Sequence, residues 1–161
     1  VGNFMRLPDD QPFNRDYLPV WNPASEELYF FRSPSDDFPL SLYRMKADGS
    51  VEEVRDLTTD LPETQSMYLG GQVDIAPDGD QMVLAVWSWD WDQRSTVVWL
   101  LDLDSGAITP LLDLADFDSV LPPWKSGEDL TDFQVWWRGS HLIVYAVDER
   151  FGGAYFFTVP E

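Results

Sequence analysis

Residues 76–86 read Ala-Pro-Asp-Gly-Asp-Gln-Met-Val-Leu-Ala-Val, a tight turn that leads directly into a short apolar run. Gly79 suits such a turn because glycine adopts positive φ without steric cost. The apolar run is too short for an ordinary helix and is bounded by turn residues, which favours a buried strand. A polar loop follows, and residues 98–101 (Val-Trp-Leu-Leu) form a second apolar run. The stretch therefore predicts consecutive strands of an antiparallel sheet.

The same pattern occurs twice more in the chain. Residues 28–31 and 143–147 are apolar runs that follow turns, and an aromatic residue recurs at Tyr43, Trp99 and Tyr155 with equal spacing. Repeats of this length, filled with short strands and tight turns, are typical of propeller blades. We therefore predict an all-β fold, a β-propeller-like array of about three four-stranded blades, with the last blade incomplete.

The repeats divide the chain into four parts. Residues 1–16 form an N-terminal segment with a possible blade-completing strand at 3–7, and residues 17–66 form blade one. Residues 67–118 form blade two, and residues 119–161 form a linker and an incomplete blade three. No segment shows a sustained helical period, although the connection at 113–131 could hold one helical turn.

Three blades are too few to close a ring, since propellers typically have four or more. The missing part could come from a larger propeller of which this chain is a fragment, from self-association with a second copy, or from a protein partner that caps an open array. The sequence leaves these three possibilities open.

The chain is strongly acidic, with a net charge of -19 and only two lysines, Lys46 and Lys125. Such a surface repels nucleic acid and anionic membranes, because both need cationic contacts. We therefore expect no nucleic-acid partner. The acidity could serve solubility, cation binding, a basic partner or adaptation to salt.

Cysteine is absent, so thiol chemistry and disulfides are excluded. The absence of cysteine does not identify the cellular compartment.

No apolar run approaches the roughly 20 residues that span a bilayer, so we expect no membrane insertion. The sequence begins at Val1 without a secretory leader, which fits a processed or excised chain. We expect an extracytoplasmic protein, whether periplasmic, secreted or on a surface.

Pro77-Asp78-Gly79, the apolar strand after it and the later Leu103-Asp104-Ser105-Gly106 resemble TolB-like β-propeller repeats. Blade one matches through Trp21-Asn22-Pro23 and through residues 42–49. Blade three departs from the pattern, because Trp137-Arg138-Gly139 lacks the Pro-Asp pair. The resemblance implies an extracytoplasmic interaction module, or the propeller that accompanies a prolyl-oligopeptidase-type hydrolase.

Nothing in the sequence looks like a catalytic centre. His141 is the only histidine, so any Ser-His-Asp triad would have to use it, and a turn or edge histidine is the simpler interpretation. One histidine without cysteine makes a zinc site improbable, and no nucleophile-elbow sequence is present. We therefore predict that the chain is not an enzyme.

Acidic residues at alternate positions are the weak metal candidates. Asp90 and Asp92, like Asp102 and Asp104, could converge on one side of the chain, and calcium prefers such oxygen ligands. No calcium-loop motif is present, so solvated carboxylates are the favoured interpretation. We expect no cofactor, with calcium at Asp90 and Asp92 as the weak alternative.

Aromatic residues in predicted loops are the candidates for contact with a partner or ligand. These are Trp89, Trp91, Trp124 and Phe151. Tryptophan combines a large apolar face with one donor, a combination enriched in interfaces. Trp136 and Trp137 alternate along a strand, so one of them must face the core, and the pattern does not say which.

These observations favour a non-catalytic protein–protein interaction or scaffold module in an exported or surface assembly. One alternative is carbohydrate or small-ligand binding through Trp89 and Trp91. The other alternative is the propeller fragment of a larger hydrolase.

Overall fold

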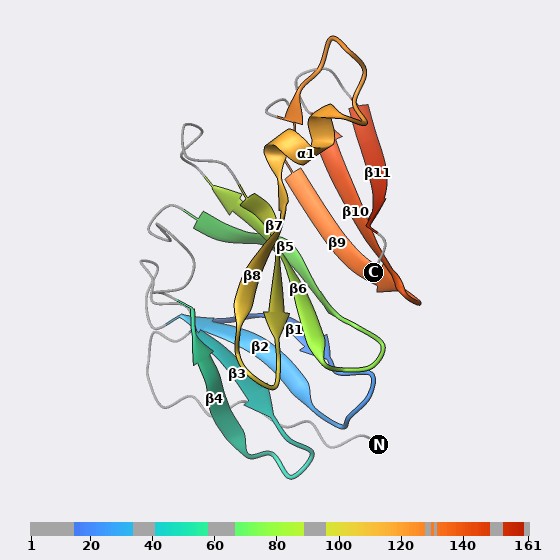
Figure 1. The fold of residues 1–161 in the computed structure, drawn as a ribbon. Helices are drawn as coiled ribbons and strands as arrows, with labels where there is room; N and C mark the ends of the chain where they lie inside the picture. The colour runs from blue at the N-terminus through green and yellow to red at the C-terminus, as the bar shows by residue number, and fades with distance from the viewer. Residues whose placement is uncertain are drawn as a thin grey trace.

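The computed structural model describes residues 15–33, 41–57, 67–88, 96–127, 130, 132–148 and 153–159. These residues form three antiparallel sheets, in which each strand pairs with the next strand of the chain (Figure 1). Blade one contains β1 (Arg15–Trp21), β2 (Leu28–Ser33), β3 (Ser41–Met45) and β4 (Val51–Asp56). Blade two contains β5 (Met67–Ile75), β6 (Gln81–Ser88), β7 (Thr96–Asp102) and β8 (Ile108–Asp113). Blade three contains β9 (Asp132–Arg138), β10 (His141–Asp148) and β11 (Gly153–Val159).

These sheets confirm the predicted fold class. One short helix, α1 (Leu114–Asp118), lies in the connection that was expected to hold a helical turn. The first strands of the blades are neighbours, since β5 packs against β1 on one side and against β9 on the other. The sheets therefore follow one another around a common inner edge, as blades do, and the third blade has three strands in the described part of the chain.

Because each sheet is a simple meander, its connections alternate between two ends of the molecule. At one end, which we call the tight-turn end, lie the short β1–β2, β5–β6 and β9–β10 connections (Figure 1). At the other, which we call the loop end, β2, β6 and β10 finish and α1 lies between blades two and three.

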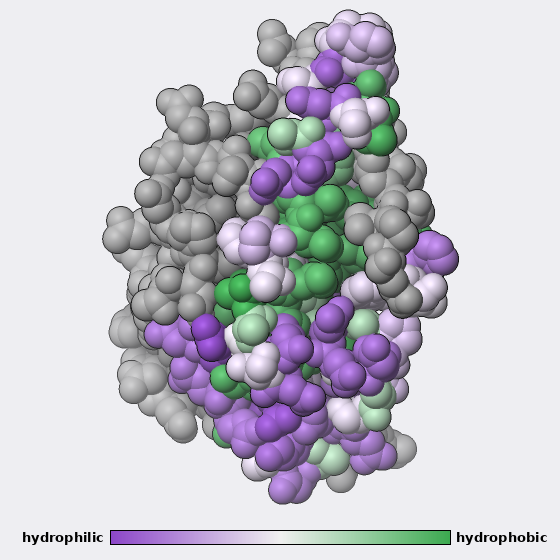
Figure 2. Space-filling view, in the orientation of Figure 1, coloured by the Kyte–Doolittle hydropathy of each residue, from purple (hydrophilic) through white to green (hydrophobic). Residues whose placement is uncertain are grey.

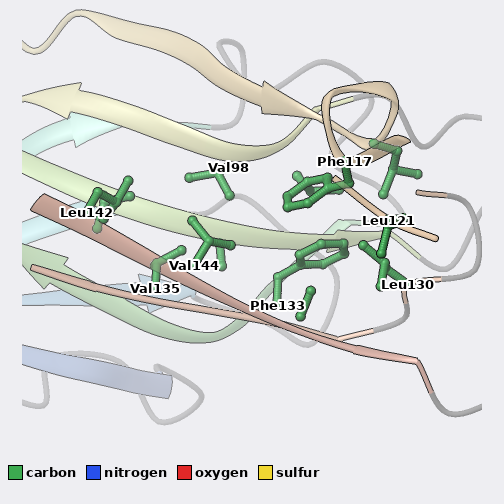
Figure 3. Packing of buried hydrophobic residues seen from close by; sticks show 13 residues of the cluster. Val98, Phe117, Leu121, Leu130, Phe133, Val135, Leu142 and Val144 are labelled. Carbon is green, nitrogen blue, oxygen red and sulfur yellow. The ribbon is translucent and has the colours of Figure 1, made fainter. Parts of the chain in front are cut away.

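Blade two is covered on both faces, because alternate residues of one strand point to opposite sides. Met82 and Leu84 of β6 belong to a core shared with blade one, whereas Val83 and Ala85 belong to a core shared with blade three. The first core also contains Phe31, and both cores are buried. In the second core, side chains of β7, α1, β9 and β10 converge between the blades (Figure 3).

A contact between two turns closes the junction of blades one and two at the tight-turn end. Asn22 is only 4% exposed, and its Nδ2 donates a hydrogen bond to the Gly79 carbonyl oxygen at 3.0 Å. Its Oδ1 accepts from the Ala24 backbone N–H at 2.9 Å, so both halves of the amide are satisfied. Gly79 has a φ of +87°, and an added Cβ would lie 2.6 Å from Ala24 Cβ and from Asn22 Oδ1. The two turns touch so closely that only glycine fits.

The junction of blades two and three is joined differently. Asp74 of β5 accepts a hydrogen bond from the Trp137 backbone N–H at 2.7 Å. The β9–β10 turn, however, has only Gly139 and Ser140 between the paired residues Arg138 and His141. No heavy atom lies within 4 Å of the position of a Cβ on Gly139, so there is open space beside this turn.

The two turn glycines provide a matched test of the contact between blades one and two. Gly79→Ala and Gly139→Ala both place alanine at positive φ, which costs about 1–2 kcal/mol. Gly79→Ala should cost about 1–3 kcal/mol more, because its Cβ meets Ala24 and Asn22. Urea unfolding of both variants measures this difference, and equal losses of stability would contradict the turn-to-turn contact.

Candidate functional site

The segment after β8 is anchored at the loop end of blades two and three. Leu114 and Phe117 of α1 are buried, and Leu121 and Leu130 extend the same apolar contact (Figure 3). Phe117 and Phe133 have ring centroids 5.6 Å apart. The α1 segment therefore fills the space between the two blades at this end.

Polar contacts fix the course of this segment. Asp116 Oδ2 accepts from the Asp113 backbone N–H at 2.8 Å, and Asp118 Oδ1 accepts from the Gly127 backbone N–H at 2.6 Å. A Cβ at residue 127 would overlap the carbonyl oxygen of Leu114, so a side chain there would force the backbone apart. The loop is thus held to α1 by its backbone.

A buried ion pair joins the loop to blade three. Lys125, one of only two lysines in the chain, forms an ion pair with Asp148 at the end of β10. The Asp148 side chain is fully buried, and that of Lys125 is 2% exposed. Burial removes both charges from water, so each depends on its partner for compensation.

Trp124 precedes this lysine and points outward. It is 68% exposed, and the Lys125 Nζ lies 5.0 Å from the centroid of its ring. This cation–π contact orients the indole while its area remains accessible. Val120, on the same loop, is 59% exposed. We call these two residues the α1-loop contact; they are large apolar side chains presented by an anchored segment.

The face of blade three that points away from blade two is partly apolar and partly exposed. Ile143 of β10 lies opposite Trp136 of β9, and Tyr145 follows on the same side of β10. Trp137 lies opposite Leu142 and packs against the second core, so Trp137, and not Trp136, is the tryptophan that faces blade two. In blade two the corresponding face is covered by the next blade.

The outer edge of blade three also differs from the other outer edges. Outer strands commonly carry charges or proline, which prevent pairing with another chain. β4 reads Val-Glu-Glu-Val-Arg-Asp, and β8 contains Pro110. β11 reads Gly-Ala-Tyr-Phe-Phe-Thr-Val, without charge or proline. This strand pairs with β10 alone in the described sheet, although its sequence resembles that of a strand with neighbours on both sides.

Most of the predicted contact and metal residues lie outside the described part of the chain, and Trp124 is the exception. The others are Trp89, Trp91, Phe151, Asp90 and Asp92. Their assignment as contact or calcium residues stays a prediction. Among the described residues, no group of three or more His, Asp or Glu side chains could hold a metal ion.

The remaining candidate residues have structural partners in turns. His141 is exposed, and its Nδ1 lies 3.4 Å from Ser140 Oγ. Asp102 Oδ1 accepts from both the backbone N–H and the hydroxyl of Ser105, each at 2.7 Å. These hydrogen bonds, the backbone one first, lower the pKa of Asp102, because they favour its charged form. Asp102 therefore stabilises the folded turn above its unfolded pKa, and this contribution is lost as the pH falls through the lower folded value.

Comparison with known proteins shows the fold and leaves the family open. No family model matches the chain, and no curated protein matches it. Solved structures do match. The oligogalacturonate lyase of Vibrio parahaemolyticus is 12% identical with a TM-score of 0.63, over 99% of this chain and 40% of the lyase. A Hadza microbial sialidase is 16% identical with a TM-score of 0.56, over 88% of this chain and 30% of the sialidase. TolB of Acinetobacter baumannii is 12% identical with a TM-score of 0.52, over 88% of this chain and 31% of TolB.

This chain thus has a propeller-like fold and spans about a third of the length of the proteins it resembles. The TolB likeness supports the predicted propeller resemblance, although the specific repeat family is not established by it.

The prediction that the chain is not an enzyme is corrected by these comparisons. Two of the three structures named above are enzymes, a lyase and a sialidase, so a fold of this kind gives no ground for excluding catalysis. The sequence argument failed because a propeller can take catalytic groups from several blades, and this chain spans only part of such a protein.

In the described part of the chain, no helix is both long and apolar enough to span a membrane.

The Lys125–Asp148 pair predicts a large difference between single and double substitutions. Lys125→Met leaves the buried Asp148 carboxylate without its cation and should cost about 3–5 kcal/mol of unfolding free energy. The double variant Lys125→Met, Asp148→Leu should lose less than the single variant, since no uncompensated charge remains. Urea unfolding measures both.

Lys46→Met is the control, because Lys46 pairs with Glu52 at 3.2 Å on an exposed part of blade one. It should cost no more than about 1 kcal/mol. A loss of similar size in Lys46→Met and Lys125→Met would contradict the assigned role of the buried pair.

Proposed function

We propose that this chain is a section of a β-propeller that acts by protein–protein interaction, with blade three as the interacting blade. The outer edge of β11, which pairs only with β10 among the described strands, carries the proposal, because its sequence lacks the charges and proline of the other two outer strands. A strand from another polypeptide or another part of a larger propeller would pair with β11 and complete the blade.

The outward face of blade three supports the same proposal. Trp136, Ile143 and Tyr145 are partly exposed on this face, where a following blade would pack. Blade two shows how such packing works, because both of its faces are covered by neighbouring blades. A partner that supplied both a strand and a sheet would bury apolar area on two sides of blade three.

Trp124 and Val120 supply a third element of the proposed interface. Hot-spot residues are most often aromatic, and an anchored side chain loses little conformational freedom on binding. The Lys125 contact and the buried part of the loop hold Trp124 in this way.

The net charge of -19 favours a partner whose contact surface is basic. An extracytoplasmic location is part of this proposal, and the resemblance to TolB-like propellers supports it.

The isolated chain should self-associate through β11, because the open edge pairs with a second copy when no other partner is present. Thr158→Lys introduces a charge into this outer strand and should give a monomer of 18.5 kDa by light scattering. The control is Thr109→Lys on β8, an exposed threonine of another outer strand, which should leave the mass unchanged. A monomeric wild-type protein at micromolar concentration would contradict the proposal.

Trp124→Ala should weaken this association by about 2 kcal/mol, as expected for an interfacial tryptophan. Trp21→Ala is the control, because Trp21 is also largely exposed but belongs to blade one. Sedimentation equilibrium measures the dissociation constants of both variants. Equal dissociation constants for the two variants would remove Trp124 from the interface.

A further inference from the structure

A cavity of about 650 Å³ lies between blades two and three at the tight-turn end. It exists because the two ends of this junction are filled differently. At the loop end Phe117, Leu121 and Leu130 occupy the space between the blades. At the tight-turn end the space beside Gly139 is open, whereas the Asn22 turn of blade one is hydrogen-bonded to the β5–β6 turn.

The floor of the cavity is apolar. Leu100 of β7, Leu111 of β8, Trp137 of β9 and Leu142 of β10 line it. Leu100, Leu111 and Trp137 are partly buried side chains at the margin of the second core. Figure 2 shows apolar side chains gathered in the hollow between blades two and three, with hydrophilic side chains toward the tight turns.

The rim of the cavity is acidic. Asp78 and Asp80 belong to the β5–β6 turn, and Asp102 ends β7. No Lys, Arg or His is among the described residues that line the cavity. Arg138 and His141 are exposed on the neighbouring hairpin but do not line it. An apolar floor beside three carboxylates is complementary to a cationic head on an aliphatic stem.

We propose that this cavity binds a lysine-bearing peptide segment of a partner protein. The aliphatic stem of the lysine lies on Leu100, Leu111 and Leu142, and its ammonium group lies among Asp78, Asp80 and Asp102. Trp137 lines the same cavity, so its indole N–H signal reports a peptide that binds there. This site lies at the opposite end of the molecule from the α1-loop contact and does not depend on the β11 edge.

The test is titration of the full chain with a capped tetrapeptide of alternating leucine and lysine. The indole N–H signal of Trp137, assigned with Trp137→Phe, should shift in ¹H–¹⁵N spectra as the peptide binds. The same peptide with acetylated lysine side chains should bind more weakly, because its charge is removed. Binding of the charged peptide should also weaken as salt is added.

Two variants locate the charge contacts. Asp102→Asn and the double variant Asp78→Asn, Asp80→Asn should each raise the dissociation constant roughly two- to fivefold per carboxylate removed. Asparagine keeps an oxygen that can accept the turn hydrogen bonds of these residues, which protects the fold. The control is Asp48→Asn, because Asp48 accepts from the backbone and hydroxyl of Ser50 as Asp102 does from Ser105, but lies in blade one.

Several results would overturn the proposal. They are an unshifted Trp137 signal, equal binding of the acetylated peptide, and an effect of Asp48→Asn as large as that of Asp102→Asn. None of these results depends on the oligomeric state, so the failure of this site and the failure of the β11 interface can be told apart.

Discussion

The packing of each sheet against the next is the constraint on which the whole structure depends. A strand whose residues are apolar on both sides needs cover on both sides, since its alternate side chains point in opposite directions. β6 meets this requirement, because Met82 and Leu84 pack toward blade one while Val83 and Ala85 pack toward blade three. An isolated blade two would leave both of these faces in water. Blade two is therefore stable only between neighbours, and the same requirement makes the outward face of blade three the natural place for further structure.

The two junctions between blades differ in how their turns pack at the tight-turn end. Asn22 and Gly79 bring the first two turns into direct contact, and this contact closes the junction. The shorter turn at Gly139 leaves the second junction open at the same end. The core continues through both junctions, so the opening costs little packing and leaves a cavity beside acidic residues. The first junction is closed by this contact, and the second is the place of the proposed peptide site.

The fold could be predicted from sequence because its signals are local. The turn at Pro77-Asp78-Gly79 and the apolar runs after each turn specify strands and hairpins, and their spacing specifies blades. The absence of the Pro-Asp pair at Trp137-Arg138-Gly139 could also be read from the sequence. This position is the short β9–β10 turn, which lies beside the cavity.

The candidate sites could be predicted only in part, because they depend on contacts between distant residues. Trp124 was identified from its loop, but its orientation depends on Lys125, whose partner Asp148 lies on another strand. The only sequence signal for that pair was the rarity of lysine in this chain. Which of Trp136 and Trp137 faces the core depended on the register between β9 and β10, which alternation alone does not fix.

The most direct measurement of the central claim is amide hydrogen exchange of the outer strands in the associated protein. An antiparallel edge strand donates hydrogen bonds only from alternate residues, whereas a strand with two neighbours donates from nearly all. We predict alternate protection in β4 and β8 and continuous protection in β11 (Gly153–Val159). Alternate protection in β11 as well would show that nothing completes blade three, and it would contradict the account.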